Sequence, residues 1–278
     1  MTNLLIHSMT EFTDLILGGL ELAGARHVVE IGAEFGGMSQ VLADYAGTVD
    51  GRLTSIDPAP APAFVAWAAQ TPHVTHLAAP SLEVIAELRD VDAWLIDGDH
   101  NYYTVLHELL AADAACERDG TPLLAFVHDV GWPTGRRDMY YAPARVPDAY
   151  RHAHEFGAGA MLDQVQLVPG QGFRGEDAWA MANVSGGPRN GVLTAVEDFI
   201  AGVGDTGRVL AFAHVPAVFG LGVLFDAEAA WSPALAELVA PFHENRLLAT
   251  LERNRLLNYL KVIEWQDAAA QDQRRTAR

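Results

Sequence analysis

Residues 27–37 of this chain read His27-Val28-Val29-Glu30-Ile31-Gly32-Ala33-Glu34-Phe35-Gly36-Gly37. A short run rich in β-branched residues predicts a strand at 27–31, and a helical pattern follows at 38–45. Between them lies a glycine-rich turn, which lets a ligand approach the backbone and points the N–H groups of the helix at it. The stretch therefore predicts a strand, a turn and a helix that together form part of a ligand site.

The same alternation continues along the first half of the chain. Strands separated by helices are typical of βαβ units, so we expect a parallel sheet. The pattern predicts further strands at 53–56, 73–77, 93–96 and 123–127, and helices at 12–22, 61–69, 82–88 and 100–116.

After residue 129 the pattern changes. Residues 130 to about 187 are rich in glycine, proline, arginine and aromatic residues and show little periodicity, which favours a lid or a binding insertion. Within this segment, residues 171–179 are predicted to form a flexible flap. Strands at 209–213 and 221–225 follow a helix at 191–201, and their short connection allows an antiparallel hairpin.

The tail from Ser232 to Trp265 is predicted to be helical, with a broad stripe of apolar residues. We expect this stripe to pack on its own domain. An interface in a homo-oligomer is the alternative that the pattern leaves open.

Composition limits the classes of partner. The chain has 278 residues, and 18 basic against 36 acidic side chains give a formal net charge of −18. Such a field repels phosphate backbones and anionic lipids, so we expect a small-molecule partner and no nucleic acid or membrane. The single cysteine, Cys116, excludes an intramolecular disulfide and a cysteine zinc site. Residues 1–7 show no signal peptide, and we expect a cytoplasmic protein.

Carboxylate and imidazole groups follow two of the predicted strands. The strand at 93–96 runs into Asp97-Gly98-Asp99-His100, and the strand at 123–127 runs into His128-Asp129. Neighbouring parallel strands bring such groups together at the carboxyl edge of the sheet, which is where open α/β sheets bind ligands. We therefore expect the chemistry to lie at this edge.

The glycine turn argues against a dinucleotide. The dinucleotide fingerprint needs a second glycine two residues after the first, where the pyrophosphate touches the backbone. Glu34 occupies that position here, and its carboxylate would repel a pyrophosphate.

The pattern Glu30-x-Gly32-x-x-x-Gly36 instead resembles the first motif of class I S-adenosylmethionine (SAM) methyltransferases. The resemblance implies a Rossmann-like α/β fold with a mostly parallel seven-stranded sheet, an antiparallel last strand and an insertion after strand 5. It also implies SAM as cofactor, with an acid at Glu30 that suits the cationic donor. Asp57 would accept hydrogen bonds from the ribose hydroxyls, and Ser81 and Leu82 would lie near adenine. The cofactor-binding residues implied in this way are Glu30, Gly32, Ala33, Gly36, Asp57, Ser81, Leu82 and Asp97.

A second segment, Asp97-Gly98-Asp99-His100-Asn101-Tyr102, resembles the Asp-Gly-Asp-His-x-Tyr segment of macrolide-sugar O-methyltransferases of the macrocin and mycinamicin type. In that subgroup an acid after the fourth strand and an acidic pair after the fifth hold magnesium. The resemblance implies a possible metal set of Asp97, His128 and Asp129. Because histidine is a poor ligand for Mg²⁺, the set suits Mn²⁺, Fe²⁺ or Zn²⁺ better. The alternative is that Asp129 caps a turn and His128 is only hydrogen-bonded.

The reaction requires removal of a proton from the acceptor. His128 and His100 are the candidate bases, since an imidazole titrates near neutral pH, and Asp97 is expected to lie between donor and acceptor. The start of the insertion carries groups suited to reading a substrate. We expect one of its two arginines to contact the substrate and the other to pair with an acid such as Asp138 or Glu155. The candidate substrate-binding residues are Trp132, Arg136, Arg137, Tyr140 and Tyr141.

These observations predict a SAM-dependent enzyme that methylates a hydroxyl of a small natural product or sugar. The alternatives are an N- or carboxyl-methyltransferase, a metal-dependent hydroxylase of the same fold, and a SAM-fold binding module without turnover. The predicted organisation is a SAM-binding half at 1–129, a substrate-binding insertion at 130–190, the rest of the sheet at 191–230 and a C-terminal helix at 231–278.

Overall fold

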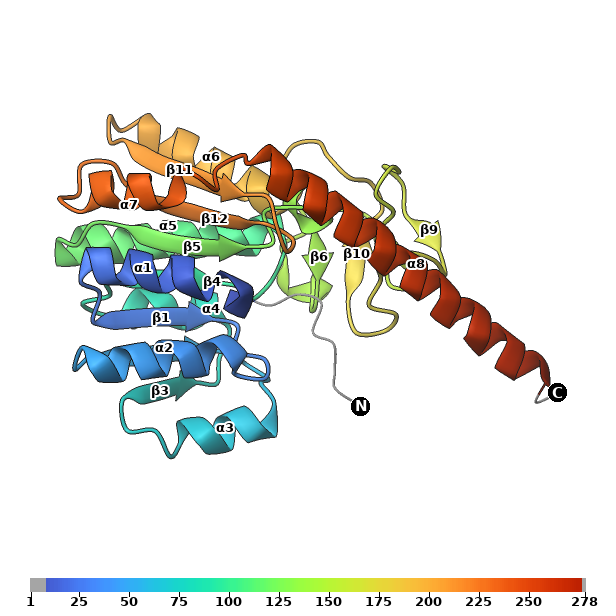
Figure 1. The fold of residues 1–278 in the computed structure, drawn as a ribbon, viewed down its shortest axis with the longest axis horizontal. Helices are drawn as coiled ribbons and strands as arrows, with labels where there is room; N and C mark the ends of the chain where they lie inside the picture. The colour runs from blue at the N-terminus through green and yellow to red at the C-terminus, as the bar shows by residue number, and fades with distance from the viewer. Residues whose placement is uncertain (1–8, 277–278) are drawn as a thin grey trace.

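The computed structural model describes residues 9–276. Its centre is a seven-stranded sheet with the order β11-β12-β5-β4-β1-β2-β3 (Figure 1). Neighbours from β5 to β3 pair in parallel, whereas β12 runs antiparallel to both β5 and β11. The predicted parallel sheet, antiparallel last strand and closing hairpin are therefore confirmed. The strands are β1 (His27–Ile31), β2 (Arg52–Ile56), β3 (Val74–Leu77), β4 (Ala93–Ile96), β5 (Leu124–His128), β11 (Leu210–Val215) and β12 (Leu221–Asp226).

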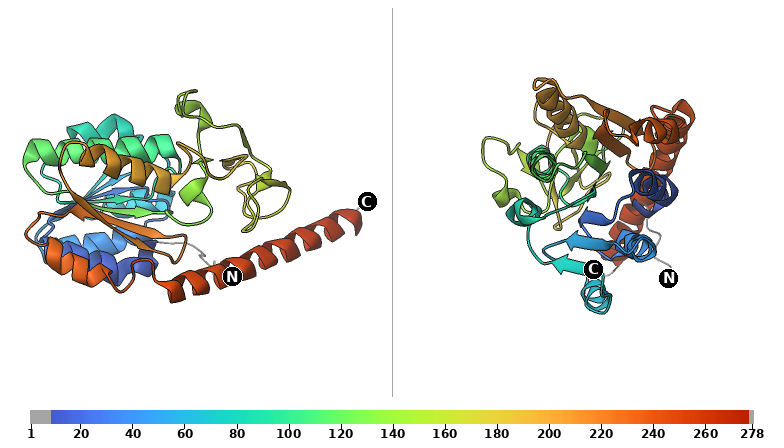
Figure 2. Two further views of the ribbon diagram at one scale, coloured as in Figure 1. Left: turned by 90° about the horizontal axis from the view of Figure 1, so that it is seen from above. Right: turned by 90° about the vertical axis from the view of Figure 1, so that its left-hand side faces the viewer.

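Helices cover both faces of the sheet, which makes three layers (Figure 2). Successive strand residues point to opposite faces, so Val28 packs toward α1, α2 and α7 while Val29 packs toward α5 and α6. Both layers bury large apolar side chains, and this is why the strands are apolar on both faces. The helices are α1 (Thr13–Ala23), α2 (Gly37–Thr48), α3 (Pro62–Ala68), α4 (Ser81–Val84), α5 (Tyr102–Asp119), α6 (Val192–Gly204), α7 (Ser232–Val239) and α8 (Arg246–Thr276), with 3-10 turns η1 (Met9–Phe12), η2 (Ile85–Glu87), η3 (Thr134–Arg136) and η4 (Pro143–Arg145).

The predicted helix at 82–88 is the short helix α4 followed by the 3-10 turn η2, and two other differences bear on the site and the tail. The helix after β4 begins at Tyr102, because the Asn101 side chain accepts a hydrogen bond from the N–H of Thr104 and caps it. His100 therefore precedes the helix and does not open it. The predicted single C-terminal helix is two helices, since the Asn245 side chain accepts from the N–H groups of Leu247 and Leu248 and starts α8 anew.

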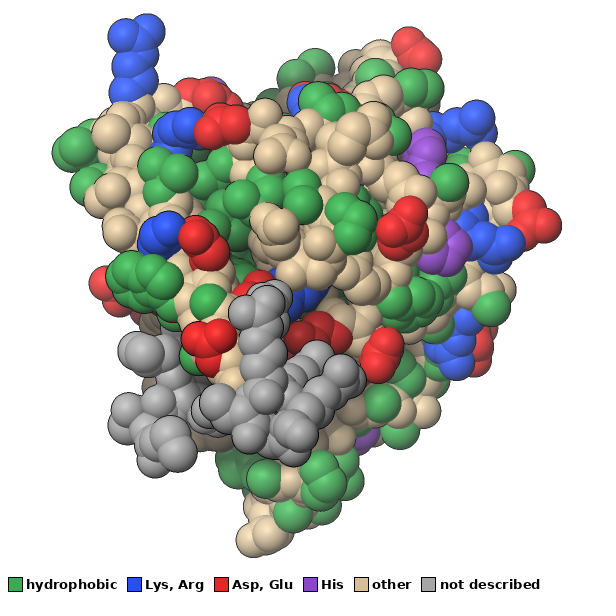
Figure 3. Space-filling model, turned by 90° about the vertical axis from the view of Figure 1, so that its right-hand side faces the viewer, with side chains coloured by type: hydrophobic (Ala, Val, Ile, Leu, Met, Phe, Trp, Pro, Cys, Tyr) green, Lys and Arg blue, Asp and Glu red, His purple; other side chains and the backbone are tan. Residues whose placement is uncertain are grey.

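The insertion after β5 lies beyond the carboxyl ends of the parallel strands, beside α8 (Figures 1 and 2). It has little regular structure, and Met139, Ala160 and Met181 form a small apolar cluster of its own. From the insertion side, exposed apolar side chains lie among acidic and basic ones (Figure 3). Its short strands form two small sheets, β6-β10-β7 and β8-β9, with bounds β6 (Met139–Tyr140), β7 (His154–Glu155), β8 (Ala158–Gly159), β9 (Val168–Pro169) and β10 (Ala180–Ala182).

Within residues 9–276, no helix is long and apolar enough to cross a membrane. The stretch 1–7, examined above for a signal peptide, lies outside the described residues, as do the outer ends of the first and last predicted parts. Helix α8 buries Leu256 and Leu260 against the body and leaves other apolar residues exposed on its outer side, among them Leu251 and Trp265. Its role in a homo-oligomer stays a prediction.

Candidate functional site

The glycine turn after β1 lies directly against the end of β4. Gly32 has a φ of +91°, and a Cβ atom placed on it would lie 2.2 Å from the carbonyl oxygen of Asp97. Gly36 has a φ of +79°, and a Cβ there would lie 2.7 Å from the ring of Phe64. Only glycine fits both positions, because each needs a left-handed backbone and space for no side chain. The first predicted motif thus sets how closely β1 and β4 approach at the carboxyl edge.

The carboxylate of Asp57 faces this turn. Its Oδ2 accepts hydrogen bonds from the backbone N–H groups of Ala33 (3.0 Å) and Glu34 (2.9 Å), and its Oδ1 accepts from the N–H of Ala59 (2.8 Å). Two carboxylate oxygens accept about four hydrogen bonds in all, so Asp57 keeps capacity for a further donor such as a hydroxyl. Asp57 therefore also holds the glycine turn in its conformation, a role that was not predicted from the sequence.

Glu30 lies inside the fold, beneath the turn. Its Oε2 accepts hydrogen bonds from the hydroxyls of Ser39 (2.5 Å) and Ser55 (2.7 Å), and the side chain is buried. Burial raises the pKa of Glu30 to about 7, although the two serine hydrogen bonds oppose this. Glu30 thus lies below the predicted donor site, with its carboxyl group held by two hydroxyls.

The two residues expected near adenine differ in exposure. Ser81 is buried, and its hydroxyl donates to Oε1 of Glu108 at 2.5 Å. Burial raises the pKa of Glu108 to about 8. Leu82 is 37% exposed. Of the two, Leu82 has the side chain available to a ligand in this structure.

His128 is held on both sides of its ring. Nδ1 lies 3.0 Å from Oδ1 of Asp97, and Nε2 lies 3.0 Å from the carbonyl oxygen of Val218. A carboxylate and a carbonyl only accept, so both ring nitrogens donate and the imidazole is charged. Burial lowers the pKa of His128, but Asp97, Asp129 and the Val218 carbonyl outweigh it and raise the pKa to about 10. This geometry does not suit the predicted base, because the ring has no free nitrogen to receive a proton at neutral pH.

His100 lies beside Asp97 and Asp129, in the place that the predicted metal set gave to His128. Its Nδ1 lies 3.1 Å from Oδ2 of Asp129, which comes from the end of the neighbouring strand β5. Asp129 itself has a φ of +60°, in the left-handed region that residues other than glycine seldom adopt. Among the described residues, ligand atoms of Asp97, His100 and Asp129 lie within 4.8 Å of one another.

This trio differs from the predicted metal set by the exchange of His128 for His100. Two carboxylate oxygens and one imidazole nitrogen fit Mn²⁺, Fe²⁺ or Zn²⁺. They fit Mg²⁺ less well, since that ion prefers oxygen ligands alone. The side chains of His100 and Asp129 are 10% and 14% exposed, so the group faces a restricted opening.

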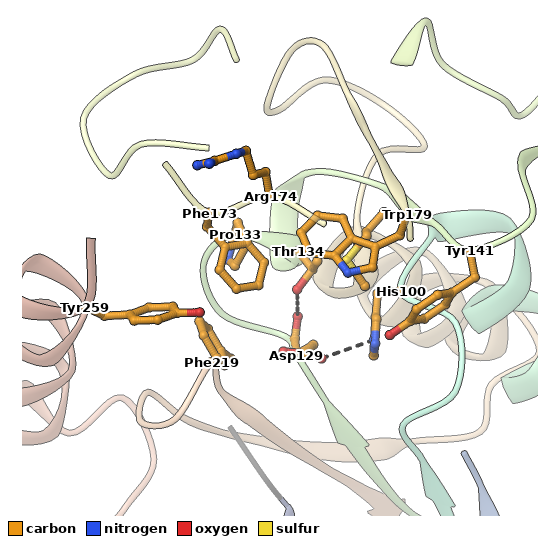
Figure 4. A pocket seen from close by; sticks show the side chains of 11 residues that line it. His100, Asp129, Pro133, Thr134, Tyr141, Phe173, Arg174, Trp179, Phe219 and Tyr259 are labelled. Carbon is orange, nitrogen blue, oxygen red and sulfur yellow. Dashed lines mark hydrogen bonds and ion pairs between the residues drawn. The ribbon is translucent and has the colours of Figure 1, made fainter. Parts of the chain in front are cut away.

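A cavity opens above His100 and Asp129 (Figure 4). Its volume is about 160 Å³, which is room for a ring or a small group and less than the roughly 300–1,000 Å³ of sites that bury a drug-sized ligand. Tyr141 lies beside His100 with ring centroids 5.9 Å apart, and it is 52% exposed. The lining residues are His100, Asp129, Pro133, Thr134, Met139, Tyr141, Phe173, Arg174, Trp179, Phe219 and Tyr259.

Of the five predicted substrate-binding residues, Tyr141 alone lines this cavity. Trp132 does not line the cavity but packs against Phe173, which does, with ring centroids 6.0 Å apart. Tyr140 is fully buried, and its hydroxyl donates to Oδ2 of Asp138 at 2.8 Å. Tyr140 therefore belongs to the core of the insertion.

The two arginines both have structural partners. Arg136 forms two hydrogen bonds of 2.6 Å with the carboxylate of Glu197 on α6, and not with Asp138 or Glu155 as expected. Arg137 is 1% exposed and donates to the carbonyl oxygens of Ala182 and Val165. Burial lowers the pKa of Arg137 to about 10. Both side chains hold the insertion together in this structure, and neither lines the cavity.

Most of the aromatic side chains that line the cavity, together called the aromatic wall (Tyr141, Phe173, Trp179, Phe219 and Tyr259), were not predicted from the sequence. Phe173, Arg174 and Trp179 come from the segment predicted as a flap, and Phe219 comes from the connection between β11 and β12. Tyr259 comes from α8, and the sequence pattern did not single it out. The clustering of aromatic residues with glycine in 171–179 was the available signal.

Comparison with known proteins gives one family match. Residues 29–130 match a family model described as a methyltransferase domain. No curated protein matches the sequence. The match to a solved methyltransferase from Podospora anserina bound to S-adenosylhomocysteine (SAH) has 11% identity and a TM-score of 0.46, and it covers 79% of each chain.

Two further solved structures have comparable likeness. An O-methyltransferase from Streptomyces achromogenes, involved in tomaymycin synthesis and solved with SAM, is 16% identical with a TM-score of 0.46, covering 79% of this chain and 80% of that one. An O-methyltransferase from Bacillus cereus in complex with SAH is 14% identical with a TM-score of 0.45, covering 79% and 81%.

Proposed function

We propose that this chain is a SAM-dependent methyltransferase that methylates a hydroxyl of a small molecule, such as a natural product or a sugar. One observation carries the proposal. In the part of the chain that matches a methyltransferase domain, the glycine turn, Asp57 and the trio Asp97, His100 and Asp129 meet at one edge of the sheet, and a cavity lies above it. When bound, SAM supplies an electrophilic methyl group on a sulfonium.

The residues of the turn would hold the donor. Gly32 and Gly36 leave the backbone open to a ligand, and Asp57 keeps capacity to accept from a ribose hydroxyl. Asp97 follows β4, at the boundary between this turn and the cavity, and its carboxylate is held in place by the charged ring of His128. A fixed carboxylate beside a cationic donor stabilises it electrostatically.

His100 is the residue best placed to remove the proton of an acceptor hydroxyl. It lines the cavity, and the carboxylate of Asp129 lies against its Nδ1, which orients the ring and stabilises the imidazolium. A hydroxyl acceptor needs such a base, whereas a carboxylate acceptor does not. The His100–Asp129 pair therefore supports O-methylation of a hydroxyl over carboxyl methylation.

The same trio also fits a divalent metal. When bound, a cation would lower the pKa of an acceptor hydroxyl. Asp97, His100 and Asp129 would supply its ligands. Removal of metal separates the two roles of His100: activity that survives exhaustive chelation supports the base, and activity that returns only with added Mn²⁺ or Fe²⁺ supports the ligand.

Methyl transfer from SAM with a labelled methyl group tests the proposal directly. The acceptors are a panel of hydroxyl-bearing natural products and glycosides, and each product is then treated with alkali. We expect label that stays bound in alkali, since methyl ethers survive and methyl esters do not. Label released by alkali would show a carboxyl-methyltransferase. Oxygen-dependent turnover with iron, and no transfer of label, would show a hydroxylase.

A further inference from the structure

The flap and the C-terminal helix meet above the cavity. Arg174 of the flap forms two hydrogen bonds with the carboxylate of Asp267 on α8, one of 2.6 Å to Oδ1 and one of 3.1 Å to Oδ2. The side chains of Arg174 and Asp267 are 12% and 24% exposed. A bidentate pair of this kind fixes geometry as well as charge. These residues are 93 positions apart in the sequence, so the pair ties the insertion to the tail.

Aromatic contacts continue the same junction toward the floor of the cavity. The ring of Phe173 lies 5.2 Å from that of Trp179, 5.6 Å from that of Phe219 and 6.0 Å from that of Tyr259. Tyr259 and Asp267 lie about two turns apart on α8. Figure 4 shows Phe173 and Tyr259 on the same side of the cavity, with Arg174 above them. Helix α8 is thus one wall of the candidate acceptor site.

The contact between Arg174 and Asp267 also balances the positive charge that Arg174 brings to the lining of the cavity. Among the described residues that line the cavity, Arg174 is the one arginine or lysine. The hydrogen bond with Asp267 raises the pKa of Arg174, and the carboxylate of Glu176 lies 3.7 Å from the same Nη2 atom. The floor carries the carboxylate of Asp129. An anionic ligand would therefore meet a carboxylate below it and a cation already paired above it.

We propose that Asp267 determines the charge specificity of the acceptor site. By pairing with Arg174 it closes the flap onto α8 and removes the cation that an anionic acceptor would use. The site then takes a ring-bearing acceptor that is neutral or cationic, and it disfavours an anionic one. This inference rests on the proposed function in treating the ligand of the cavity as a methyl acceptor, whereas the binding preference itself is measurable without turnover.

Three phenols that differ in charge test the proposal: tyramine (cationic), 4-ethylphenol (neutral) and 3-(4-hydroxyphenyl)propionate (anionic). Their affinities are measured by calorimetry, with and without SAH. We expect the wild type to bind the anion more weakly than the amine by roughly tenfold, since like charges oppose it. In Asp267→Asn, which leaves Arg174 with only the exposed carboxylate of Glu176, the anion gains and the amine loses, so the ratio falls toward one or reverses.

Matched variants separate charge from folding. Glu264→Gln breaks an exposed ion pair with Lys261 on the same helix, at 2.7 Å, and it should leave the ratio unchanged. Asp267→Glu keeps the charge and should restore most of the wild-type preference. Unchanged SAH affinity in all variants shows that the donor site is intact.

The proposal would be overturned by equal or tighter binding of the anion by the wild type, or by an anion-to-amine ratio that Asp267→Asn does not move. Absence of binding by all three phenols would also overturn it, because the aromatic wall would then hold no ring. A wild type that binds the phenols with the expected preference but does not bind SAH would contradict the methyltransferase function and leave the specificity of the cavity established.

Discussion

The imidazole of His128 lies 3.0 Å from the carboxylate of Asp97, and the contact joins the ends of two neighbouring strands. With Val218 on its other nitrogen, the ring has two acceptors and a pKa raised to about 10, since these acceptors and Asp129 outweigh its burial. His128 therefore positions Asp97 and does not exchange protons at neutral pH. The residue left to act on an acceptor is His100.

Substitution of the two histidines should separate these roles. His100→Gln is expected to lower methyl transfer by about 10²–10⁴-fold with little change in stability, which is the usual contribution of a general base. His128→Gln removes one partner of a buried charge pair and should cost about 3 kcal/mol of stability. Urea unfolding and initial rates measure both. Full activity in His100→Gln, with rates lost only in His128→Gln, would reverse the assignment.

Titration with Mn²⁺ tests the metal-binding capacity of the trio. Because Asp97, His100 and Asp129 place their ligand atoms within 4.8 Å of one another, we expect one ion to bind, seen by electron paramagnetic resonance. Asp129→Asn should abolish the binding. Glu34→Gln, which changes an exposed acid on the nearby turn, is the control and should leave it intact. Binding that persists in Asp129→Asn would place the ion elsewhere.

The buried carboxyl group of Glu30 should make stability depend on pH. Burial raises its pKa to about 7 in the folded state, against 4.5 for an ordinary glutamate. The folded state thus holds the proton more tightly, and the stability contributed by Glu30 is lost as pH rises from about 4.5 to about 7. Glu30→Gln stays neutral, so its stability relative to the wild type should rise between pH 4 and pH 8. A difference that is the same at both pH values would show that Glu30 titrates normally.

Substitutions of the two arginines of the insertion should lower the stability of the protein by different amounts, and neither should change its acceptor preference. Arg137→Leu leaves the carbonyl groups of Ala182 and Val165 without this donor, at a cost of about 1–3 kcal/mol for each group that finds no other. Arg136→Gln breaks an ion pair whose side chains are 45% and 50% exposed, and it should cost about 0–1 kcal/mol. We expect neither change to alter acceptor preference. A shifted preference in Arg136→Gln would restore the substrate contact predicted from the sequence.

The sheet could be predicted from the sequence because its signals are local. Each strand is a short apolar run next to a helical pattern, and glycines at 32 and 36 mark the turn whose backbone excludes a side chain. The edge that carries Asp97, His100 and Asp129 follows from the parallel order of the strands.

The pairing of groups at this edge could not be predicted in the same way. His128 ends β5 and His100 lies in the segment after β4, and the carboxylate of Asp129 lies 3.1 Å from Nδ1 of His100 and 3.7 Å from Nδ1 of His128. No periodicity reveals this arrangement. The aromatic wall depends on contacts across long stretches of chain, such as Phe173 with Tyr259. The tail was predicted as one helix because its apolar stripe continues on both sides of Asn245. The cap that Asn245 forms, which starts a new helix there, leaves no mark on that stripe.

Calorimetric titration of the purified chain with SAH tests whether the site at the glycine turn binds the methyl donor and its product. We expect the wild type to bind SAH, and Asp57→Ala, which removes the acceptor for a ribose hydroxyl and the partner of the turn, to lose that binding while Glu34→Gln keeps it. A folded wild type that shows no heat of binding with SAH or SAM would show that this chain is not a SAM-dependent enzyme.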